Sequence, residues 1–352
     1  MLRSGAMVAE RMRGWVAGVV IFTLAGVAAA AGRPPLPVRD DKAGKWGFAD
    51  PRGATVVPAQ FLRVTRFHEG LAAVCREPDR WEYIDVTGKT VIPGPFQEAR
   101  SFFDGRAAVR AEAGGPLGYI DPTGKLVIPA RFKLAEDFHD RRAVVRVDAK
   151  GQLGAIDARG ELVAPARFAA LGPYADGLAP FSDGKRWGYV DRDGRVVIPP
   201  RFVRAEPFSE ELAFVVLKEV KTKLDAAYID RSGEIVVKGL TQPGGPFHEG
   251  LARIYDLTTG HFIDRTGKKV IEGTGWVGDF SEGLAGVAEG GKVGYVDRGG
   301  KPVIAPQWDS AGAFADGVAV VADLKDNALV NHRYIDRTGK VLATVSATEA
   351  PP

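Results

Sequence analysis

Histidine is the first residue type to examine for chemistry, because imidazole binds metals and anions near neutral pH. Three of the five histidines, His68, His139 and His248, stand just after a repeated aromatic residue. One interpretation is a shared rim that binds a metal or an anionic ligand. The other is a tolerant loop position, because the remaining units carry Asp104, Ala175, Ser209, Ser281 and Ala315 there. We expect the tolerant loop.

Aspartate recurs as the first residue of a D-x-x-G motif that is written nine times. Calcium takes about 6–8 oxygen ligands, whereas each such segment typically offers one carboxylate. A second acidic row precedes "GLA" and its variants, at Glu69, Asp104, Asp176, Glu249, Glu282 and Asp316. A glycosidase would need two of these carboxylates about 5–9 Å apart in a cleft. Repetition of both positions favours a structural role, so we predict no metal site.

Known catalytic signatures are missing from the sequence: it contains no G-x-S-x-G, H-E-x-x-H, Walker A or dinucleotide-binding fingerprint. The single cysteine, Cys75, excludes a disulfide within the chain and ends an apolar run that is typical of a strand. We therefore predict no catalytic residue, no cofactor and a non-enzymatic protein. The alternative is a secreted propeller-type hydrolase or lyase with its site in a central funnel.

Tryptophans offer a different chemistry, since aromatic faces stack on sugars and peptides. Trp46, Trp81 and Trp187 occupy the same repeat position. Packing between neighbouring units is the interpretation that we favour. A stacking platform for a ligand is the alternative.

Two insertions break the regular spacing of the repeats and are the candidate binding loops. They are "LKEVKTKLDA" (Leu217–Ala226) and "ADLKDNALVNH" (Ala322–His332), at equivalent places in their units. We expect both to project from one edge, where loops on a rigid scaffold often bind partners. The candidate residues are Lys218, Lys221, Lys223, Asn327 and His332, with the lysines suited to an acidic surface. The alternative is that both are tolerated insertions without a role.

The elements that position these residues follow from the repeat itself. The aspartates are Asp50, Asp85, Asp121, Asp157, Asp191, Asp230, Asp264, Asp297 and Asp336, at steps of 33–39 residues. Short runs rich in Val, Ile and Tyr, bounded by Gly and Pro, predict strands. D-x-x-G between two such runs predicts a tight hairpin, in which Asp accepts from backbone N–H groups and Gly supplies a positive φ. Proline after "VI" is interpreted as the end of a strand.

"KWGFADPRGATVVPAQF" (45–61) and "RWGYVDRDGRVVIPPRF" (186–202) resemble the bacterial WG-repeat family. The Trp-Gly pair is intact only at Trp46-Gly47 and Trp187-Gly188, is altered in four units and is lost in units six, seven and nine. The resemblance covers about residues 36–345. It implies β-structural modules in bacterial, often exported, proteins and no particular reaction.

The predicted fold is therefore all-β, built from tandem repeats of about 36 residues with three to four strands each. A β-propeller-like ring is favoured, because both faces of the strands are apolar, as blades between blades require. An open β-solenoid of hairpins is the alternative, since nine units exceed the usual number of about 4–8 blades. The expected domains are a signal peptide or anchor (1–31), the repeat domain (32–345) and a tail (346–352).

The N-terminal segment combines Arg3, Arg11 and Arg13 with an uncharged run from Trp15 to Ala31 that ends in small residues. This order is typical of a cleaved signal peptide. We expect a periplasmic or secreted protein without a lipid anchor, because no cysteine follows the run. A membrane anchor is the alternative if the segment is not cleaved. Without these residues the net charge falls from +3 to +1, since three Arg and one Glu are removed.

A nearly neutral mature chain gives no reason to expect a nucleic-acid partner. The sequence thus predicts an exported, non-enzymatic binding or scaffold protein whose partner is a protein, a peptide or an envelope glycan. A purely structural spacer is the remaining alternative. The identity of the ligand and the oligomeric state do not follow from the residues.

Overall fold

The computed structural model describes residues 33–40, 43–50, 53–148, 151–220, 223–255, 259–273, 275–326 and 328–345. The chain divides into two compact units, Met1–Arg33 and Pro34–Pro352. The predicted signal segment and the predicted tail lie outside the described residues. The second unit, to which all that follows refers, has only β-strands as its described elements, which confirms the all-β prediction.

Nine antiparallel sheets follow one another along the chain, and we number them as blades. The first blade has β1 (Leu36–Asp40), β2 (Lys45–Ala49) and β3 (Thr55–Phe61). The second has β4 (Arg63–Val64), β5 (Leu71–Glu77), β6 (Arg80–Asp85) and β7 (Thr90–Phe96). The third has β8 (Glu98–Ala99), β9 (Ala107–Arg110), β10 (Leu117–Ile120) and β11 (Leu126–Phe132). The fourth has β12 (Leu134–Ala135), β13 (Arg142–Arg146), β14 (Leu153–Asp157) and β15 (Leu162–Phe168).

The later blades repeat this order. The fifth has β16 (Ala170–Leu171), β17 (Leu178–Ser182), β18 (Trp187–Asp191) and β19 (Val196–Phe202). The sixth has β20 (Arg204–Ala205), β21 (Ala213–Val220), β22 (Lys223–Ile229) and β23 (Ile235–Leu240). The seventh has β24 (Gly244–His248), β25 (Leu251–Tyr255), β26 (Gly260–Asp264) and β27 (Lys269–Glu272). The eighth has β28 (Leu284–Glu289), β29 (Lys292–Asp297) and β30 (Pro302–Trp308), and the ninth has β31 (Ser310–Ala311), β32 (Val318–Lys325), β33 (Ala328–Asp336) and β34 (Val341–Val345).

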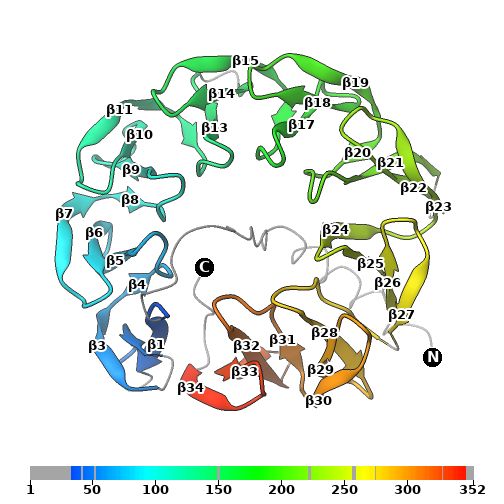
Figure 1. The fold of residues 1–352 in the computed structure, drawn as a ribbon. Helices are drawn as coiled ribbons and strands as arrows, with labels where there is room; N and C mark the ends of the chain where they lie inside the picture. Colours follow the sequence, from blue (N-terminus) through cyan, green and yellow to red (C-terminus); the bar gives the residue numbers. More distant parts are fainter. Residues whose placement is uncertain are drawn as a thin grey trace. The chain divides into compact units, whose positions relative to one another are not determined.

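The blades form a closed ring, with the first strand of each blade toward the centre and the last strand outermost (Figure 1). This confirms the β-propeller arrangement, with nine blades, and shows that the open solenoid is wrong. In an antiparallel blade the first and third connections lie at one end and the second connection at the other. We call the end with the D-x-x-G turns the turn face. The opposite end is the hairpin face.

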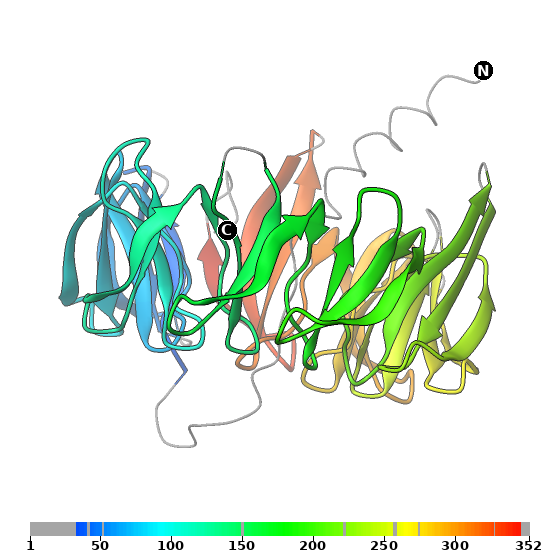
Figure 2. The same cartoon turned by 90° about the horizontal axis from the view of Figure 1, so that it is seen from above.

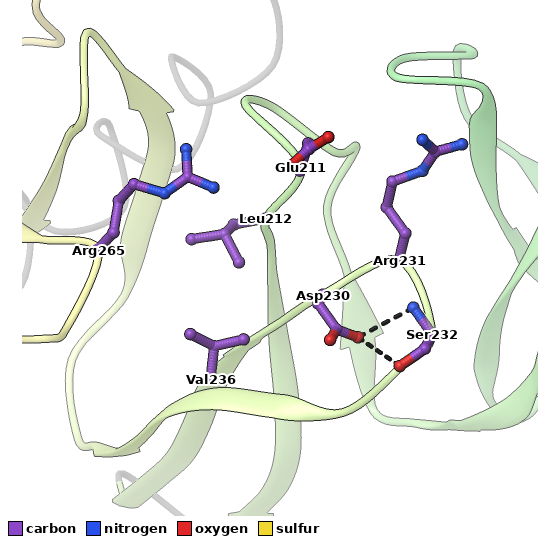
Figure 3. Close-up of a pocket in the computed structure, with 7 residues that line it drawn as sticks. All are labelled: Glu211, Leu212, Asp230, Arg231, Ser232, Val236 and Arg265. Carbon is purple, nitrogen blue, oxygen red and sulfur yellow. Dashed lines mark hydrogen bonds between the residues drawn. The ribbon is translucent and has the colours of Figure 1, made fainter.

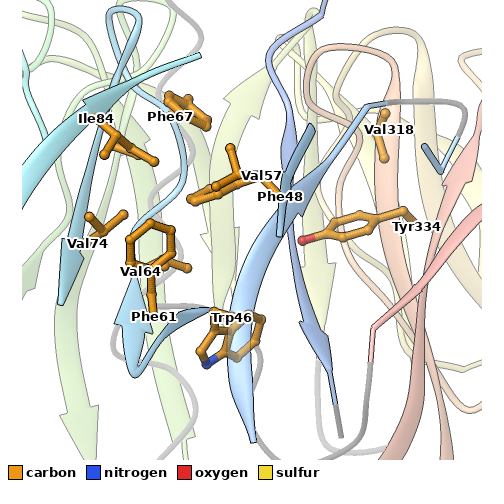
Figure 4. Packing of buried hydrophobic residues seen from close by; sticks show 11 residues of the cluster. Trp46, Phe48, Val57, Phe61, Val64, Phe67, Val74, Ile84, Val318 and Tyr334 are labelled. Atoms are coloured by element: carbon orange, nitrogen blue, oxygen red, sulfur yellow. The ribbon is translucent and has the colours of Figure 1, made fainter. Parts of the chain in front are cut away.

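Ring closure joins the ninth blade to the first. The Tyr334 hydroxyl donates to the carbonyl of Pro37 at 3.1 Å. One buried cluster contains Tyr334 and Val318 of the ninth blade together with Trp46 and Phe48 of the first and residues of the second (Figure 4). These contacts join strands from opposite ends of the chain, so side chains hold the ring shut.

The same kind of bond joins neighbouring blades inside the ring. A buried tyrosine two residues before the aspartate donates to a main-chain carbonyl 17 residues further on, in the next blade. The five pairs are Tyr83–Arg100, Tyr119–Glu136, Tyr189–Glu206, Tyr228–Gly245 and Tyr295–Gly312, at 2.6–2.8 Å. Because such a hydroxyl is buried, its hydrogen bond satisfies a group that would otherwise be costly to bury. The Tyr334 bond therefore joins the ninth blade to the first in the way that these five bonds join their blades.

The D-x-x-G motif forms the predicted hairpin turn in all nine blades. The carbonyl of each aspartate accepts from the N–H of the glycine, and its N–H donates to the carbonyl of the residue that follows the glycine. Its Oδ1 accepts from one or two N–H groups of the turn. All nine glycines have a positive φ. A Cβ on Gly88 would lie 2.6 Å from Cγ2 of Val57 in the preceding blade, and a Cβ on Gly53 would lie 2.5 Å from the carbonyl of Leu342. The glycine therefore serves both the turn and the junction.

The glycine of the Trp-Gly pair accommodates a bulge. In the first blade Trp46 pairs with Phe61 and Phe48 with Val57, so the single residue between them on β2 faces three residues of β3. The extra residues cross over Gly47, where any Cβ would meet the bulge backbone. Five blades share this arrangement, at Gly47, Gly118, Gly154, Gly188 and Gly294.

Three of the four blades without that glycine, the sixth, the seventh and the ninth, lack the wide bulge. Ala227 of the sixth blade faces a bulge that is one residue shorter, while Arg333 of the ninth faces regular pairing. In the second blade, where Glu82 replaces the glycine, the bulge itself contains Gly94, which lies against the carbonyl of Trp81.

The prediction that proline ends a strand is wrong. Strand β3 runs from Thr55 to Phe61 through Pro58, and the proline lies in the bulge. A bulge on the outermost strand leaves residues unpaired, so the missing N–H is tolerated there.

Candidate functional site

The two predicted loops are the ends of two long hairpins. In the sixth blade β21 and β22 pair as far as Val220 with Lys223, and in the ninth β32 and β33 pair as far as Lys325 with Ala328. The loop prediction is wrong, because the inserted residues continue the strands. Both hairpins project from the hairpin face, as expected (Figure 2).

The predicted binding residues of the sixth blade lie on this hairpin. Lys218 is exposed on β21 and pairs across the ladder with Asp225. Its neighbour Glu219 accepts two hydrogen bonds from Arg204, at 2.7 and 2.8 Å. Lys223 lies on β22, whereas Lys221 falls outside the described residues. Lys218 is thus accompanied by carboxylates, and an exclusively basic surface is not present among the described residues of this hairpin.

The ninth-blade hairpin differs from its prediction at His332. This residue was expected in a loop, but it lies on β33 and is only 7% exposed. Burial lowers its pKa, and its Nδ1 has no hydrogen-bond partner. Asn327 falls outside the described residues. Among the large hydrophobic residues that the structure describes on this hairpin, Leu324 is exposed, at 54%.

The three candidate tryptophans lie on three blades, each opposite a phenylalanine of the outermost strand. Trp46 is 5% exposed inside the cluster of Figure 4, while Trp81 and Trp187 are half-buried against two other clusters. A stacking role for them remains a prediction. Trp276, which lies before the eighth blade, is 46% exposed, more than any of them. Its exposure had no signal in the sequence, because it replaces a residue type that is otherwise buried.

His68 and His139 lie on the first connection of their blades, at the turn face, whereas His248 is the last residue of β24. The side chain of Phe102, and not that of Phe103, is the fully buried counterpart of the repeated aromatic, so Phe103 takes the histidine position. Its ring lies 4.3 Å from that of His68 and 5.3 Å from that of His139. Burial lowers the pKa of both histidines. Among the described residues no group of three or more His, Cys, Asp or Glu could hold a metal ion.

The second acidic row forms a chain of bonds between blades. Seven carboxylates at this repeat position accept from a backbone N–H at the start of the next blade, as Glu69 does from Gly105 at 3.0 Å. Seven junctions share this bond, with Glu69, Asp104, Asp140, Asp176, Glu210, Glu249 and Glu282 as acceptors. Sequence reasoning missed Asp140 and Glu210, because the next residue in those two units is not glycine. This geometry favours the structural role that the repetition predicted.

Two pockets open at equivalent junctions on the turn face. One, of 360 Å³, lies between the sixth and seventh blades and is lined by Glu211, Leu212, Asp230, Arg231, Ser232, Val236 and Arg265 (Figure 3). The other, of 490 Å³, lies between the fourth and fifth blades and is lined by Asp140, Arg141, Arg142, Asp157, Ala158, Arg159 and Arg192. Neither was predicted. The available signal was the replacement of the glycine after the repeated acid by Arg141 and by Glu211 in these two units alone.

Comparison with protein families gives one match. The family described as WG containing repeat matches seven segments that together span more than half of the chain: 46–77, 83–112, 118–150, 154–187, 187–219, 262–292 and 294–322. A search of curated proteins gives no match.

The chain is similar to solved structures at low sequence identity. A crystal structure of a eukaryotic initiation factor has a TM-score of 0.61 at 12% identity, covering 91% of this chain and 97% of that one. The computationally designed Ika8 protein has a TM-score of 0.47 at 13% identity, covering 82% and 97%. BamB from Moraxella catarrhalis has a TM-score of 0.41 at 13% identity, covering 77% and 96%. The first of these supports the fold alone.

Proposed function

The chain belongs to the WG containing repeat family, and from that premise we propose that it is an exported, non-enzymatic binding or scaffold protein. Its partner is a protein, a peptide or a cell-envelope glycan. The observation that carries the proposal is the pair of long hairpins on one face of the ring. They extend strands that belong to the packed blades, so the blades hold the base of each hairpin in place.

A rigid base matters because binding loses less conformational entropy when the contacting segment is already ordered. In the ninth blade Asp323 binds Arg333 at 2.7 Å, and Asp309 accepts from the N–H of Leu324 at 2.8 Å. In the sixth blade Arg204 holds Glu219 from a neighbouring strand. Each hairpin is therefore fixed to its own blade beyond the regular ladder. Exposed Leu324 supplies apolar area of the kind that protein interfaces bury.

A non-enzymatic role is supported by the use of the repeated carboxylates. The aspartates of the D-x-x-G turns accept backbone N–H groups, and seven acids of the second row join blades. A carboxylate held in this way is committed to the frame. The two sets of carboxylates that could have supplied paired acids for hydrolysis therefore have a structural role.

Export rests on the N-terminal segment, whose basic start, uncharged run and small residues are typical of a signal peptide. The structure of the segment lies outside the described residues. Within the described residues, no helix is long and apolar enough to cross a membrane. We expect the intact mass of the protein recovered from its host to correspond to a chain that begins near Ala31. A mass that includes residues 1–31 would contradict cleavage.

Shortening the hairpins tests the binding role. One variant replaces residues 219–224 by Asn-Gly, which closes a two-residue hairpin at the Lys218–Asp225 pair. A second replaces residues 324–329 by Asn-Gly at the Asp323–Val330 pair. The control replaces Pro78-Asp79, at the same place in the second blade, by Asn-Gly. Immobilised proteins are exposed to a solubilised envelope extract, and the captured molecules are identified by mass spectrometry.

We expect the control to capture the same partner as the unmodified protein and the shortened variants to lose it. Equal capture by all variants would contradict a role for the hairpins. Turnover of an envelope substrate by the unmodified protein would instead favour the hydrolase or lyase alternative.

A further inference from the structure

The pocket between the fourth and fifth blades has an excess of positive charge. Four arginines and two aspartates line it. Asp140 accepts the N–H of Gly177 and pairs with Arg192 at 3.0 Å, and Asp157 accepts N–H groups of its own turn. The side chains of Arg141 and Arg159 have neither a hydrogen bond nor an ion pair among the described residues. Two exposed guanidinium groups thus remain without a counter-charge in one pocket.

A third guanidinium is fixed beside them. The side chain of Arg142 donates from Nε to the carbonyl of Arg192 at 2.7 Å and from Nη1 to the carbonyl of Arg141 at 3.0 Å. Its Nη2 lies 4.0 Å from Asp193, at the limit of an ion pair. These bonds hold it in one orientation. A pre-oriented guanidinium next to two unpaired ones is a suitable environment for an oxyanion, which arginine binds through paired N–H donors.

The backbone distinguishes this pocket, together with its equivalent two blades later, from the other junctions of the ring. In the first connections of the blades, the residue after the repeated acid is glycine with a positive φ, as at Gly177 (+83°) and Gly283 (+79°). Arg141 takes the same conformation at +60°, although a side chain is strained there. Residues held in such conformations are concentrated at functional sites. Glycine would be the unstrained choice at this position, yet the chain has an arginine there.

The equivalent pocket two blades later supplies a comparison within the same molecule. Glu211, also at a positive φ, takes the place of Arg141, Leu212 that of Arg142, and Ser232 that of Arg159 (Figure 3). Its lining has two arginines and two acids and so has no excess charge. The excess in the larger pocket therefore belongs to particular residues and not to the repeat.

We propose that the pocket lined by Arg141, Arg142, Arg159 and Arg192 binds a small dianion, a phosphate monoester or a dicarboxylate. Two unpaired guanidinium groups match two negative charges. The volume of 490 Å³ is within the range of pockets that hold small molecules. The site lies on the turn face, opposite the long hairpins, and does not depend on the function proposed for them.

Isothermal titration calorimetry of the purified protein at low ionic strength tests the proposal, with glucose 6-phosphate and succinate as probes and glucose as the neutral counterpart. The test variant is Arg141→Gly with Arg159→Ser, which installs the residues found at the equivalent positions of other blades. Glycine relieves the strain at residue 141, so loss of folding is not expected. The control is Glu211→Gly, the same change in the equivalent turn.

We expect saturable binding of at least one dianion with one site per chain, no binding of glucose, at least tenfold weaker binding by the test variant, and an unchanged affinity in the control. The probe that binds more tightly shows whether the pocket prefers a phosphate monoester or a dicarboxylate. Absence of saturable binding by both dianions would overturn the proposal. Equal affinity of the test variant and the unmodified protein, or equal binding of glucose, would also overturn it.

Discussion

At the scale of single residues, glycine is used for two separable reasons. Gly70 and Gly88 both have a positive φ, at +81° and +87°. Open space surrounds the position of a Cβ on Gly70, whereas a Cβ on Gly88 would lie 2.6 Å from Val57. One glycine serves the backbone alone, and the other also allows two blades to approach.

This difference predicts the effect of two alanine substitutions. Gly70→Ala should lower the free energy of unfolding by about 1–2 kcal/mol, the cost of a left-handed alanine. Gly88→Ala should add an overpacking cost of about 1–3 kcal/mol. Chemical denaturation of both variants checks the order. Val57→Ala in the Gly88→Ala background should recover part of the second cost, and equal losses in the two single variants would contradict the contact.

Residue identity also limited what the sequence could tell. The nine aspartates and glycines of the turns were predictable, because the hydrogen bonds and the positive φ are local. Phe102 and Phe103 are adjacent, and only packing against Tyr83 decides which is buried. The pocket arginines were not predicted, because the sequence does not show which side chains of neighbouring blades face each other. Asp140 and Arg192 are 52 positions apart in sequence and 3.0 Å apart in space.

At the scale of the blade, the glycine of the Trp-Gly pair leaves room for the bulge of the outermost strand. Gly188 lies under the bulge of β19, where a Cβ would meet the backbone near Ile198 and Pro200. Ala227 occupies the same position in the sixth blade, whose bulge is shorter. The glycine was visible in the sequence. The bulge was not, because it depends on the pairing of two strands.

Exchanging these residues tests whether the wide bulge requires a glycine opposite it. Gly188→Ala should destabilise the fold by about 1–3 kcal/mol or more, since backbone atoms cannot turn away as a side chain can. Ala227→Gly should cost only about 0.5–1 kcal/mol, mainly through backbone entropy. Urea denaturation followed by tryptophan fluorescence measures both. A similar cost for the two changes would show that the bulge does not require glycine.

The hairpins show how an element can be mistaken in sequence. Residues 217–226 are polar and follow a change of spacing, so they were interpreted as a loop. Pairing of Lys218 with Asp225 and of Glu219 with Leu224 makes them a strand extension. The position and the direction of the insertions were predictable, because both follow the same strand of the repeat.

At the scale of the whole molecule, closure depends on a junction between the two ends of the chain. Tyr334 donates to Pro37 as Tyr228 donates to Gly245 inside the ring. The chain connects the sixth blade to the seventh, whereas only side chains and backbone contacts connect the ninth to the first. The same lost bond should therefore have different consequences at the two places.

Each Tyr→Phe change should cost about 0.5–1.5 kcal/mol in global stability, the usual contribution of one hydrogen bond. Only Tyr334→Phe should also raise local opening at the closing junction. Native-state hydrogen exchange measures this as faster exchange of amides in β1 and β34, with no change there in Tyr228→Phe. Unchanged exchange at β1 in Tyr334→Phe would mean that the packed cluster of Figure 4 holds the ring without this bond.

The closing junction has a further consequence. Within residues 33–345, no strand is shared between the two ends: β1 to β3 form the first blade, and β31 to β34 form the ninth. The ring therefore has no topological need to begin where it does. A circular permutant that links Val345 to Leu36 and opens at another blade boundary would contain the same sheets and the same nine junctions, so the order of the blades around the ring, and not the position of the ends, defines the molecule.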